Sequence, residues 1–475
     1  MSDKGKVKLS RRDFLRTLGL GVGAAAVGIA AKPLGGTTLA ANPNFEARHF
    51  SDPAGRPNRP WWVKTVDQPT IEIDWAKMKR YNEGYKADLG TGTVRGGGFE
   101  AYVGKEKSDE LNAISATTLK DGILNNVPGY TLKDQALKGA QDAGRVGMSF
   151  VGPQKAKTPE EKGVPKWTGS PEEGSRILRA AFRHMGAATV GFVELNENTK
   201  KLIYSFDPDG KELIFTNDLE PSETETQRLI PNTAKSVLVY TIQMSEETLK
   251  RAPTPLGQQT TGLAYKRHTV VQAAMQEFLR GMGYMGMGSA SINALGIAPA
   301  FGVLAGLGEM SRLNRMITPE FGPMVRCFII LTDMPVAFDK PIDAGVMEFC
   351  KRCKKCAEAC ATGALSFDDE PSWETRGPWN NPGHKAYFED STKCMTYWRE
   401  VGTNCGICFS VCPFAKKDKA WIHEWVKATA STAPVMDGFM RSMDDAFGYG
   451  AQKDCEEWWQ LDLPEYGTDS SGMIW

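Results

Sequence analysis

Apolar residues in the middle of the chain recur with two different spacings, one helical and one extended. A helix is predicted to begin near His268, because apolar residues then recur at the i, i+3 and i+4 positions of one helix face. These residues are Val271, Ala274, Met275, Phe278 and Leu279. Short runs rich in β-branched residues predict strands at 189–193, 202–204, 213–215, 236–242 and 325–332. With further helices predicted at 132–143 and from Pro171 onward, the pattern indicates a mixed α/β or α+β core over residues 167–338.

The region before this core has a weaker pattern. Residues 42–166 are rich in Pro, Gly and aromatic residues, and apart from the helix at 132–143 they are predicted to be irregular and to wrap the core. The glycine-rich stretch 90–98 lacks the Lys-Ser/Thr pair of a phosphate-binding loop, so an ordinary loop is predicted there. Residues 281–288 combine glycine with methionine, which suits either core packing or a wall against a flat ligand.

Eight of the ten cysteines lie between residues 350 and 412, which indicates a metal site. Their short spacings are typical of a bacterial ferredoxin with two [4Fe–4S] clusters, in which the fourth cysteine of each run binds the other cluster. We therefore assign four cysteines to cluster 1: Cys350, Cys353, Cys356 and Cys412. The other four are assigned to cluster 2: Cys360, Cys394, Cys405 and Cys408.

The two runs depart from the usual pattern in two places. Ala361 stands where the usual run has proline, and ten residues separate Cys394 from Cys405 where two are usual. Zinc held by paired Cys-x2-Cys motifs is an alternative. Disulfides fit less well, because geometry restricts which cysteines can pair. Cys327 and Cys455 have no spacing partner and are predicted to be buried apolar residues.

Length and charge narrow the class of protein. A chain of 475 residues has room for two or three domains. Its 57 basic and 57 acidic residues cancel, which gives no support for a nucleic-acid partner.

The first 41 residues are predicted to be an export signal. Arg11 and Arg12 precede Phe14 and Leu15, and a soft apolar run follows at 18–31, which is the pattern of a twin-arginine signal. The apolar run is short for a membrane span, and no other stretch reaches about 18 apolar residues. Any attachment to a membrane is therefore expected to need a partner protein.

The order of these parts resembles the respiratory reductive dehalogenases. The resemblance is carried by the signal, by the motifs at 305–308 (Ala-Gly-Leu-Gly), 317–322 (Ile-Thr-Pro-Glu-Phe-Gly) and 332–335 (Thr-Asp-Met-Pro), and by the cysteine runs. It implies an α+β fold, with a nitroreductase-like core that binds a base-off corrinoid. A two-[4Fe–4S] ferredoxin-like module at 339–416 and a C-terminal strap at 417–475, with a short helix around Trp421 and Trp425, would follow. The five histidines form no cluster, which agrees with a cobalt that has no protein ligand.

The same resemblance implies the reaction and its setting. An outside respiratory donor would reduce the cluster farther from the cobalt, and the second cluster would pass electrons to the corrinoid, where an organohalide loses halide. The substrate is expected to be a chlorinated alkene, alkane or arene. The protein is expected on the outer face of the cytoplasmic membrane, held there by a small integral membrane anchor protein.

The family pattern also suggests the groups that handle the proton. It places a tyrosine about sixty residues before a basic residue, which Tyr265 and Arg326 match, with Asn293 between them to hold substrate or halide. A free phenol has a pKa of about 10, and a nearby guanidinium makes a phenol a better acid. The second-choice donors are Tyr240 and Tyr284, and the second-choice cations are Arg312 and Arg315, which would otherwise be solvated helix charges.

Two other functions fit parts of the sequence. An epoxyqueuosine-reductase-like enzyme also combines a corrinoid domain with two clusters, but it acts on tRNA in the cytoplasm. The export signal and the balanced charge argue against it. An iron–sulfur electron-transfer subunit is the second alternative, and the large region before the clusters argues against that one.

Overall fold

The computed structural model describes residues 49–143, 145–291, 293, 295–415 and 450–468. The predicted export signal and the predicted helix around Trp421 and Trp425 lie outside these residues. Within the described part, no helix combines the length and the apolar character that crossing a membrane requires.

Three antiparallel strands form the main sheet, in the order β2 (Val190–Glu194), β6 (Ser236–Gln243) and β9 (Val325–Thr332). Every residue of the central strand β6 is buried. A continuous apolar run, rather than an alternating one, is the pattern of a strand covered on both faces. The strands predicted at 189–193, 236–242 and 325–332 are therefore confirmed.

A second, smaller sheet has the order β3-β5-β4. Its strands are β3 (Glu212–Thr216), β4 (Ser222–Glu223) and β5 (Gln227–Pro231). The strand predicted at 213–215 is confirmed, whereas the one at 202–204 is wrong. There the chain forms the 3-10 helix η4 (Thr199–Leu202), and Ile203 makes only an isolated bridge to Gly296.

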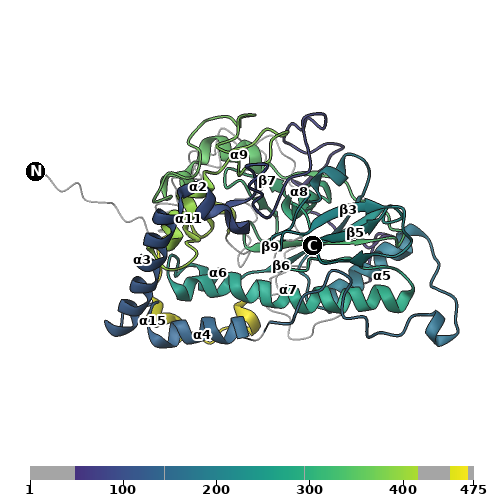
Figure 1. Cartoon of the computed structure of the whole chain (residues 1–475), viewed down its shortest axis with the longest axis horizontal. Coiled ribbons are helices and arrows are strands. Elements are labelled where there is room, and N and C mark those ends of the chain that lie inside the picture. The colour runs from purple at the N-terminus through teal and green to yellow at the C-terminus, as the bar shows by residue number, and fades with distance from the viewer. Residues whose placement is uncertain (1–48, 144, 292, 294, 416–449, 469–475) are drawn as a thin grey trace, which may run out of the picture.

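The long helix α7 (Pro255–Met282) covers one face of the main sheet, and α8 (Ala298–Leu304) packs against the other (Figure 1). The helix α7 begins at Pro255, well before the predicted start near His268. Thr254 caps it by accepting a hydrogen bond from Gly257 N at 3.1 Å, and proline suits the first helical position. The early turns carry buried polar residues instead of an apolar face, so periodicity did not reveal them.

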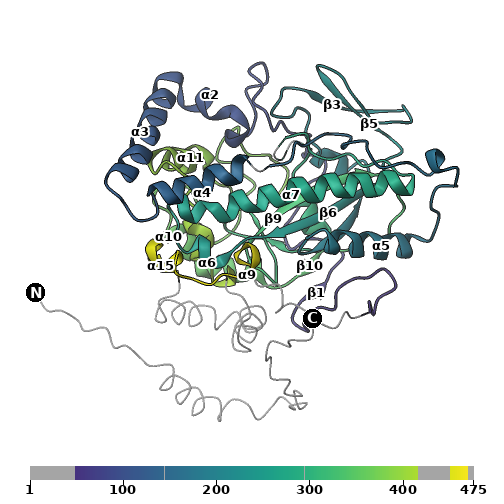
Figure 2. The same cartoon turned by 90° about the horizontal axis from the view of Figure 1, so that it is seen from below.

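The prediction of an irregular region at 42–166 is wrong for residues 94–124. These form the π-helix η2 (Val94–Gly98), α2 (Phe99–Val103) and α3 (Lys105–Leu124). Only Ser108, Leu111 and Gly122 are buried in α3. The helix therefore has no apolar face that the sequence pattern could reveal. The helix predicted at 132–143 is confirmed as α4 (Leu132–Ala143), which packs along α7 (Figure 2).

The cysteines of the two runs lie on short helices and in the loops beside them, at one end of the molecule (Figure 1). These are α9 (Val346–Cys353), α10 (Lys355–Glu358), α11 (Ser391–Glu400) and α12 (Ile407–Ser410). Helix α11 packs against α3 and against η2, so the N-terminal region closes over the cysteine-bearing segment. The α+β class predicted for the chain is confirmed, with this segment following the core in sequence.

Short elements complete the structure. Residues 450–468 lie against the core, because Trp459 Nε1 donates to Asp134 Oδ1 of α4 (2.9 Å) and Trp458 Nε1 donates to Thr248 Oγ1 (3.1 Å). The remaining helices are α5 (Pro171–His184), η3 (Glu160–Lys162), α6 (Glu246–Leu249), η5 (Pro413–Ala415), α15 (Cys455–Trp458) and η7 (Glu465–Gly467). The remaining strands are β1 (Lys64–Thr65), β7 (Glu309–Met310), β8 (Met316–Ile317) and β10 (Ile342–Asp343).

Candidate active site

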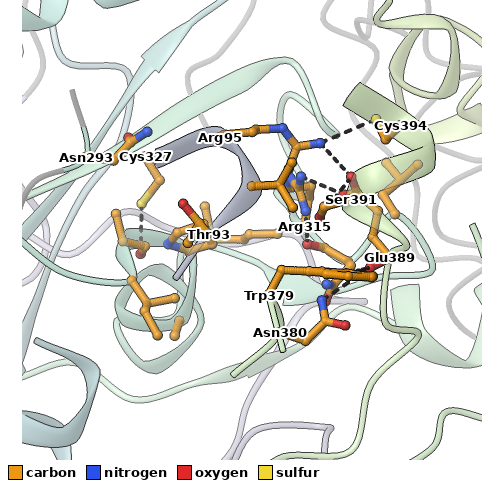
Figure 3. Close-up of a pocket in the computed structure, with 18 of the residues that line it drawn as sticks. Thr93, Arg95, Asn293, Arg315, Cys327, Trp379, Asn380, Glu389, Ser391 and Cys394 are labelled. Atoms are coloured by element: carbon orange, nitrogen blue, oxygen red, sulfur yellow. Dashed lines mark hydrogen bonds and ion pairs between the residues drawn. The ribbon is translucent and has the colours of Figure 1, made fainter. Parts of the chain in front are cut away.

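One large cavity, of about 960 Å³, lies where the core meets the cysteine-bearing segment. Its wall combines the stretch around η2, the first half of α7, the loop before α8, the start of β9 and parts of residues 360–409. Figure 3 shows a portion of this wall. A concave site assembled from distant segments is the usual setting for a cofactor and its substrate.

The structure brings Tyr265, Asn293 and Arg326 together on this wall. Asn293 Nδ2 lies 3.5 Å from Tyr265 Oη, at the long end of the hydrogen-bond range. The guanidinium carbon of Arg326 lies 5.5 Å from the centre of the Tyr265 ring, within the range of a cation–π contact. A phenol, an amide and a cation therefore meet at one point of the cavity.

Packing between α7 and β9 fixes this arrangement. Tyr265, on α7, meets the ring of Phe328 on β9 edge-on, with 5.7 Å between the ring centres. Arg326 precedes Phe328 on the same strand, and its Nη2 donates to Thr261 Oγ1 of α7 at 3.1 Å. Asn293 has a φ of 62°, in the left-handed region that asparagine tolerates better than most residues.

Arg326 combines a positive charge with a hydrogen-bond donor that has no acceptor in the described part of the chain. Burial lowers the pKa of Arg326, as do Arg315 and Arg95, whereas Tyr265 raises it. An arginine side chain in a protein nevertheless stays protonated. Its Nε finds no hydrogen-bond partner in the described part of the chain. An anion or a polar ligand in the cavity would meet this charge.

The second-choice donors lie elsewhere. Tyr240 is buried and shares a hydrogen bond with His268 Nδ1 at 2.8 Å, and Tyr284 donates to the main-chain oxygen of Trp167 at 2.8 Å. Neither tyrosine lines the cavity. Among the tyrosines considered from the sequence, only Tyr265 faces this space.

The same cavity is lined by the four cysteines assigned to cluster 2: Cys360, Cys394, Cys405 and Cys408. Cys394 and Cys408 lie on α11 and α12, while the other two lie in the loops after α10 and before α12. The assignment from sequence is crossed, because the fourth cysteine of each run is assigned to the other cluster. It grouped these four although Cys360 belongs to the first run and the other three follow it at a distance. The structure brings all four to the wall of one cavity.

The four cysteines assigned to cluster 1 surround a separate, small cavity: Cys350, Cys353, Cys356 and Cys412. Arg312 lies beside it, and the expectation of a solvated helix charge is wrong for this residue. Its side chain is buried and donates to the main-chain oxygens of Cys350 (2.9 Å) and Ser366 (2.7 Å). Arg312 therefore shapes the loop that carries the cluster 1 cysteines and does not face the large cavity.

None of the ten cysteines forms a disulfide. Within the described residues, no three His, Cys, Asp or Glu side chains are grouped as ligands of a single metal ion. Cys455 is buried, as predicted. Cys327 is only partly buried, because it lines the large cavity, where its Sγ donates to the main-chain oxygen of Ala298 at 3.2 Å (Figure 3).

Sequence reasoning missed an ionic group at the cluster 2 end of the cavity. Glu389 bridges two cations, with Oε1 2.5 Å from Arg95 Nη2 and Oε2 2.7 Å from Arg315 Nη2. Burial raises the pKa of Glu389, but Arg315 and Arg95 outweigh burial and lower it to about 2. Arg95 belongs to the glycine-rich stretch that was predicted to be an ordinary loop, and Thr93, Gly96 and Gly97 from that stretch also line the cavity.

A second missed pair is Glu83 and Tyr204, which both line the cavity. Burial raises the pKa of Glu83 to about 7, although Tyr204 and Arg95 lower it. No motif marks either residue. By contrast, residues 281–288 do not line the cavity, and Gly286 and Gly288 pack against Gln276 and Gln272 of α7. Core packing, one of the two interpretations of that segment, is what the structure shows.

Two sequence models of known families match this chain. One, described as a reductive dehalogenase subunit, matches residues 58–230 and 222–336. The other, described as a 4Fe-4S double cluster binding domain, matches residues 349–415 and so contains all eight cysteines of the two runs.

Several proteins are similar to this chain in amino-acid sequence. The trichloroethene reductive dehalogenase of Dehalococcoides mccartyi is 31% identical over 569 residues, covering 98% of this chain and 99% of that protein. The tetrachloroethene reductive dehalogenase of Sulfurospirillum multivorans is 37% identical over 318 residues, covering 64% of this chain and 63% of that protein. The epoxyqueuosine reductase of Bacillus subtilis is 26% identical over 163 residues, which cover 30% of this chain.

Among solved structures, a catabolic reductive dehalogenase has a similar fold. Its TM-score is 0.59 at 22% sequence identity, and the match covers 84% of this chain. The match covers 51% of the other chain, so this protein spans about half the length of that structure. The likeness therefore concerns the fold.

Proposed function

The chain belongs to the reductive dehalogenase family, and we propose that it replaces a halogen of a small organohalide with hydrogen in the cavity lined by Tyr265, Asn293 and Arg326. The reaction consumes two electrons and one proton and releases halide. The main support is that the four cysteines of cluster 2 and the Tyr265 group line one cavity. Electrons and a proton can therefore reach the same substrate.

The residues of the cavity suit a corrinoid. Its volume of about 960 Å³ lies at the upper end of the range for small-molecule sites, which is about 300–1,000 Å³. Within the described residues, Ser291 Oγ, Asn381 Oδ1, His384 Nδ1 and Arg326 Nε have no hydrogen-bond partner, and all four residues line the cavity. Burial lowers the pKa of His384 to about 4, so its ring is neutral. These atoms would hold the amide groups at the edge of a corrinoid.

A bound corrinoid supplies the low-valent cobalt chemistry that breaks the carbon–halogen bond, and the protein positions and tunes it. Cluster 1 would take electrons from the outside donor and cluster 2 would pass them inward, because only the cluster 2 cysteines line the large cavity. The chain thus provides a path with two steps that ends beside the substrate.

The chain's own residues manage the proton. Tyr265 donates the proton of Oη to the carbon that has lost its halogen. The Arg326 guanidinium and Asn293 Nδ2 then stabilise the phenolate that remains, through opposite charge and a hydrogen bond. Asn293 also presents a donor to the departing halide. The 3.5 Å separation of Asn293 and Tyr265 is long, and such contacts often tighten when substrate binds.

The similar proteins suggest the order in which substrates should be tested. The names of the reductive dehalogenases from Dehalococcoides mccartyi and Sulfurospirillum multivorans give trichloroethene and tetrachloroethene as their substrates. We therefore infer that a chlorinated ethene is the first candidate, ahead of halogenated alkanes and arenes. The cavity wall also includes Ile297, Ala300 and Val303, which suit an apolar substrate.

We also infer the cellular setting from the sequence. The paired arginines at positions 11 and 12 support export of the folded protein by the twin-arginine route. A small integral membrane anchor protein and a respiratory electron donor would then hold the enzyme at the outer face of the cytoplasmic membrane and supply it with electrons. Organohalide respiration is the process that this arrangement would serve.

Halide release is the direct test of this function. Anaerobically purified holoenzyme with a reduced viologen donor should release chloride from trichloroethene or tetrachloroethene, and the release should stop when the viologen is left oxidised. Turnover of an epoxyqueuosine-containing tRNA stem loop with no halide release would favour the queuosine alternative instead. If neither substrate leads to oxidation of the viologen, and the protein only passes electrons to an acceptor protein, an enzymatic role is contradicted.

A further inference from the structure

Arg95 connects the N-terminal region to a cluster 2 cysteine. Its Nη2 lies 3.4 Å from Cys394 Sγ, within hydrogen-bond distance for sulfur, although the two residues are 299 positions apart in sequence. Figure 3 shows the Arg95 side chain reaching across the cavity wall to Cys394 on α11. The guanidinium thus touches an atom that would be bonded to iron in the loaded enzyme.

The position of this guanidinium is fixed from two sides. Glu389 Oε1 accepts a hydrogen bond from the same Nη2 at 2.5 Å, and Arg315 holds the other carboxylate oxygen at 2.7 Å. The Glu389 side chain is 4% exposed. The Trp398 ring lies 4.8 Å from the guanidinium carbon of Arg95 and packs against it.

Glu389 is itself anchored through its main chain. Its carbonyl oxygen accepts hydrogen bonds from Trp379 Nε1 (3.3 Å) and Asn380 Nδ2 (3.2 Å), which Figure 3 shows side by side. A planar guanidinium held by an anchored carboxylate has little freedom to turn away. The contact between Arg95 and Cys394 is therefore built into the fold.

The charges of the group do not cancel. Arg95 and Arg315 share one carboxylate, so the group keeps one net positive charge beside cluster 2. The arginine at cluster 1 acts differently, because the hydrogen bonds of Arg312 go to main-chain oxygens, including those of Cys350, Lys351, Ser366 and Asp368. Arg95, in contrast, donates to the sulfur of Cys394 itself.

We propose that Arg95 is a positioning residue that raises the reduction potential of cluster 2. Hydrogen bonds to cluster sulfurs and the charge nearby set the potential of such clusters. A reduced cluster carries one more negative charge than an oxidised one, so a donor and a net positive charge stabilise the reduced form. The inference rests on the proposed function in one respect, which is that Cys394 binds a cluster.

The test is a redox titration of the holoenzyme and its variants, followed by electron paramagnetic resonance under anaerobic conditions. In Arg95→Met the midpoint potential of one cluster should become more negative, with the reduced form destabilised about tenfold, or about 59 mV for one electron. The other cluster should keep its potential. Arg95→Lys retains a charge and should recover a large part of the shift.

Lys393→Met is the matched control. Lys393 precedes Cys394 in sequence, but its side chain is 56% exposed and pairs with Asp390, so water screens its charge and no shift is expected. Equal shifts in Lys393→Met and Arg95→Met, or an unchanged midpoint in Arg95→Met with full iron content, would overturn the proposal. If Arg95→Met binds less iron, a shift in the same direction is expected in Arg95→Gln, which loses the charge but can still donate to Glu389. An unchanged midpoint potential in Arg95→Gln would overturn the proposal equally.

The titration also separates this inference from the proposed function. A wild-type protein without iron–sulfur signals would remove the basis of both. A wild-type protein with two titrating clusters and active dehalogenation, but with potentials that do not respond to Arg95, would leave the function intact and reject only the role of Arg95.

Discussion

Replacing Tyr265 by Phe lowers the rate of halide release by about 10²–10⁴-fold, which is the usual contribution of a general acid. The variant keeps its packing, because the ring still meets Phe328 edge-on and only the hydroxyl is lost. Iron and corrinoid content should stay at the wild-type level. Steady-state chloride release, measured beside metal analysis of the same preparation, checks both parts of this prediction.

A matched control is Tyr284→Phe. Its hydroxyl donates to the main-chain oxygen of Trp167 and does not face the cavity, so turnover should stay near the wild-type rate. Near-normal turnover in Tyr265→Phe would rule out the assignment of Tyr265 as proton donor. A comparable loss in both variants would point to a general effect on packing.

The second large effect concerns the crossed cluster ligands. Cys412→Ala should lose cluster 1 and Cys360→Ala should lose cluster 2, each lowering the iron content from about eight to about four per chain and abolishing turnover. Turnover fails in both cases because the electron path needs two steps. The measurement is iron analysis together with electron paramagnetic resonance of the remaining cluster.

Two further variants decide which cluster each change removes. Cys350→Ala defines the spectrum without cluster 1, and Cys405→Ala defines the spectrum without cluster 2. The spectrum of Cys412→Ala should match the first and that of Cys360→Ala should match the second. A Cys360→Ala spectrum that matches Cys350→Ala would show that each run binds its own cluster, against the crossed assignment.

The assignment of the cysteines to two clusters could be predicted from the sequence, because it depends on the number of residues between them. Metal ligands in short loops are fixed by the number of residues between them, and the rule of a crossed fourth ligand extends this to Cys360 and Cys412. The family resemblance suggested Tyr265, Asn293 and Arg326, which the structure brings to one wall. The roles of these three residues stay predictions until the variants are measured.

The ionic group around Glu389 could not be predicted in this way. Arg95 and Glu389 are 294 positions apart, neither belongs to a motif, and a charged residue in a sequence is usually exposed. Only the packing of η2 and α3 against α11 brings them together. The start of α7 was missed for a related reason, because its first turns bury polar residues such as Gln259 and Thr260 that look like surface positions.

The central claim is that one cavity serves both a corrinoid and cluster 2, and cobalt content tests it most directly. Protein matured with corrinoid available and purified without oxygen should contain about one cobalt for about eight irons, with the visible absorbance of a corrinoid. Iron and sulfide at that level with no cobalt in any preparation would contradict the claim.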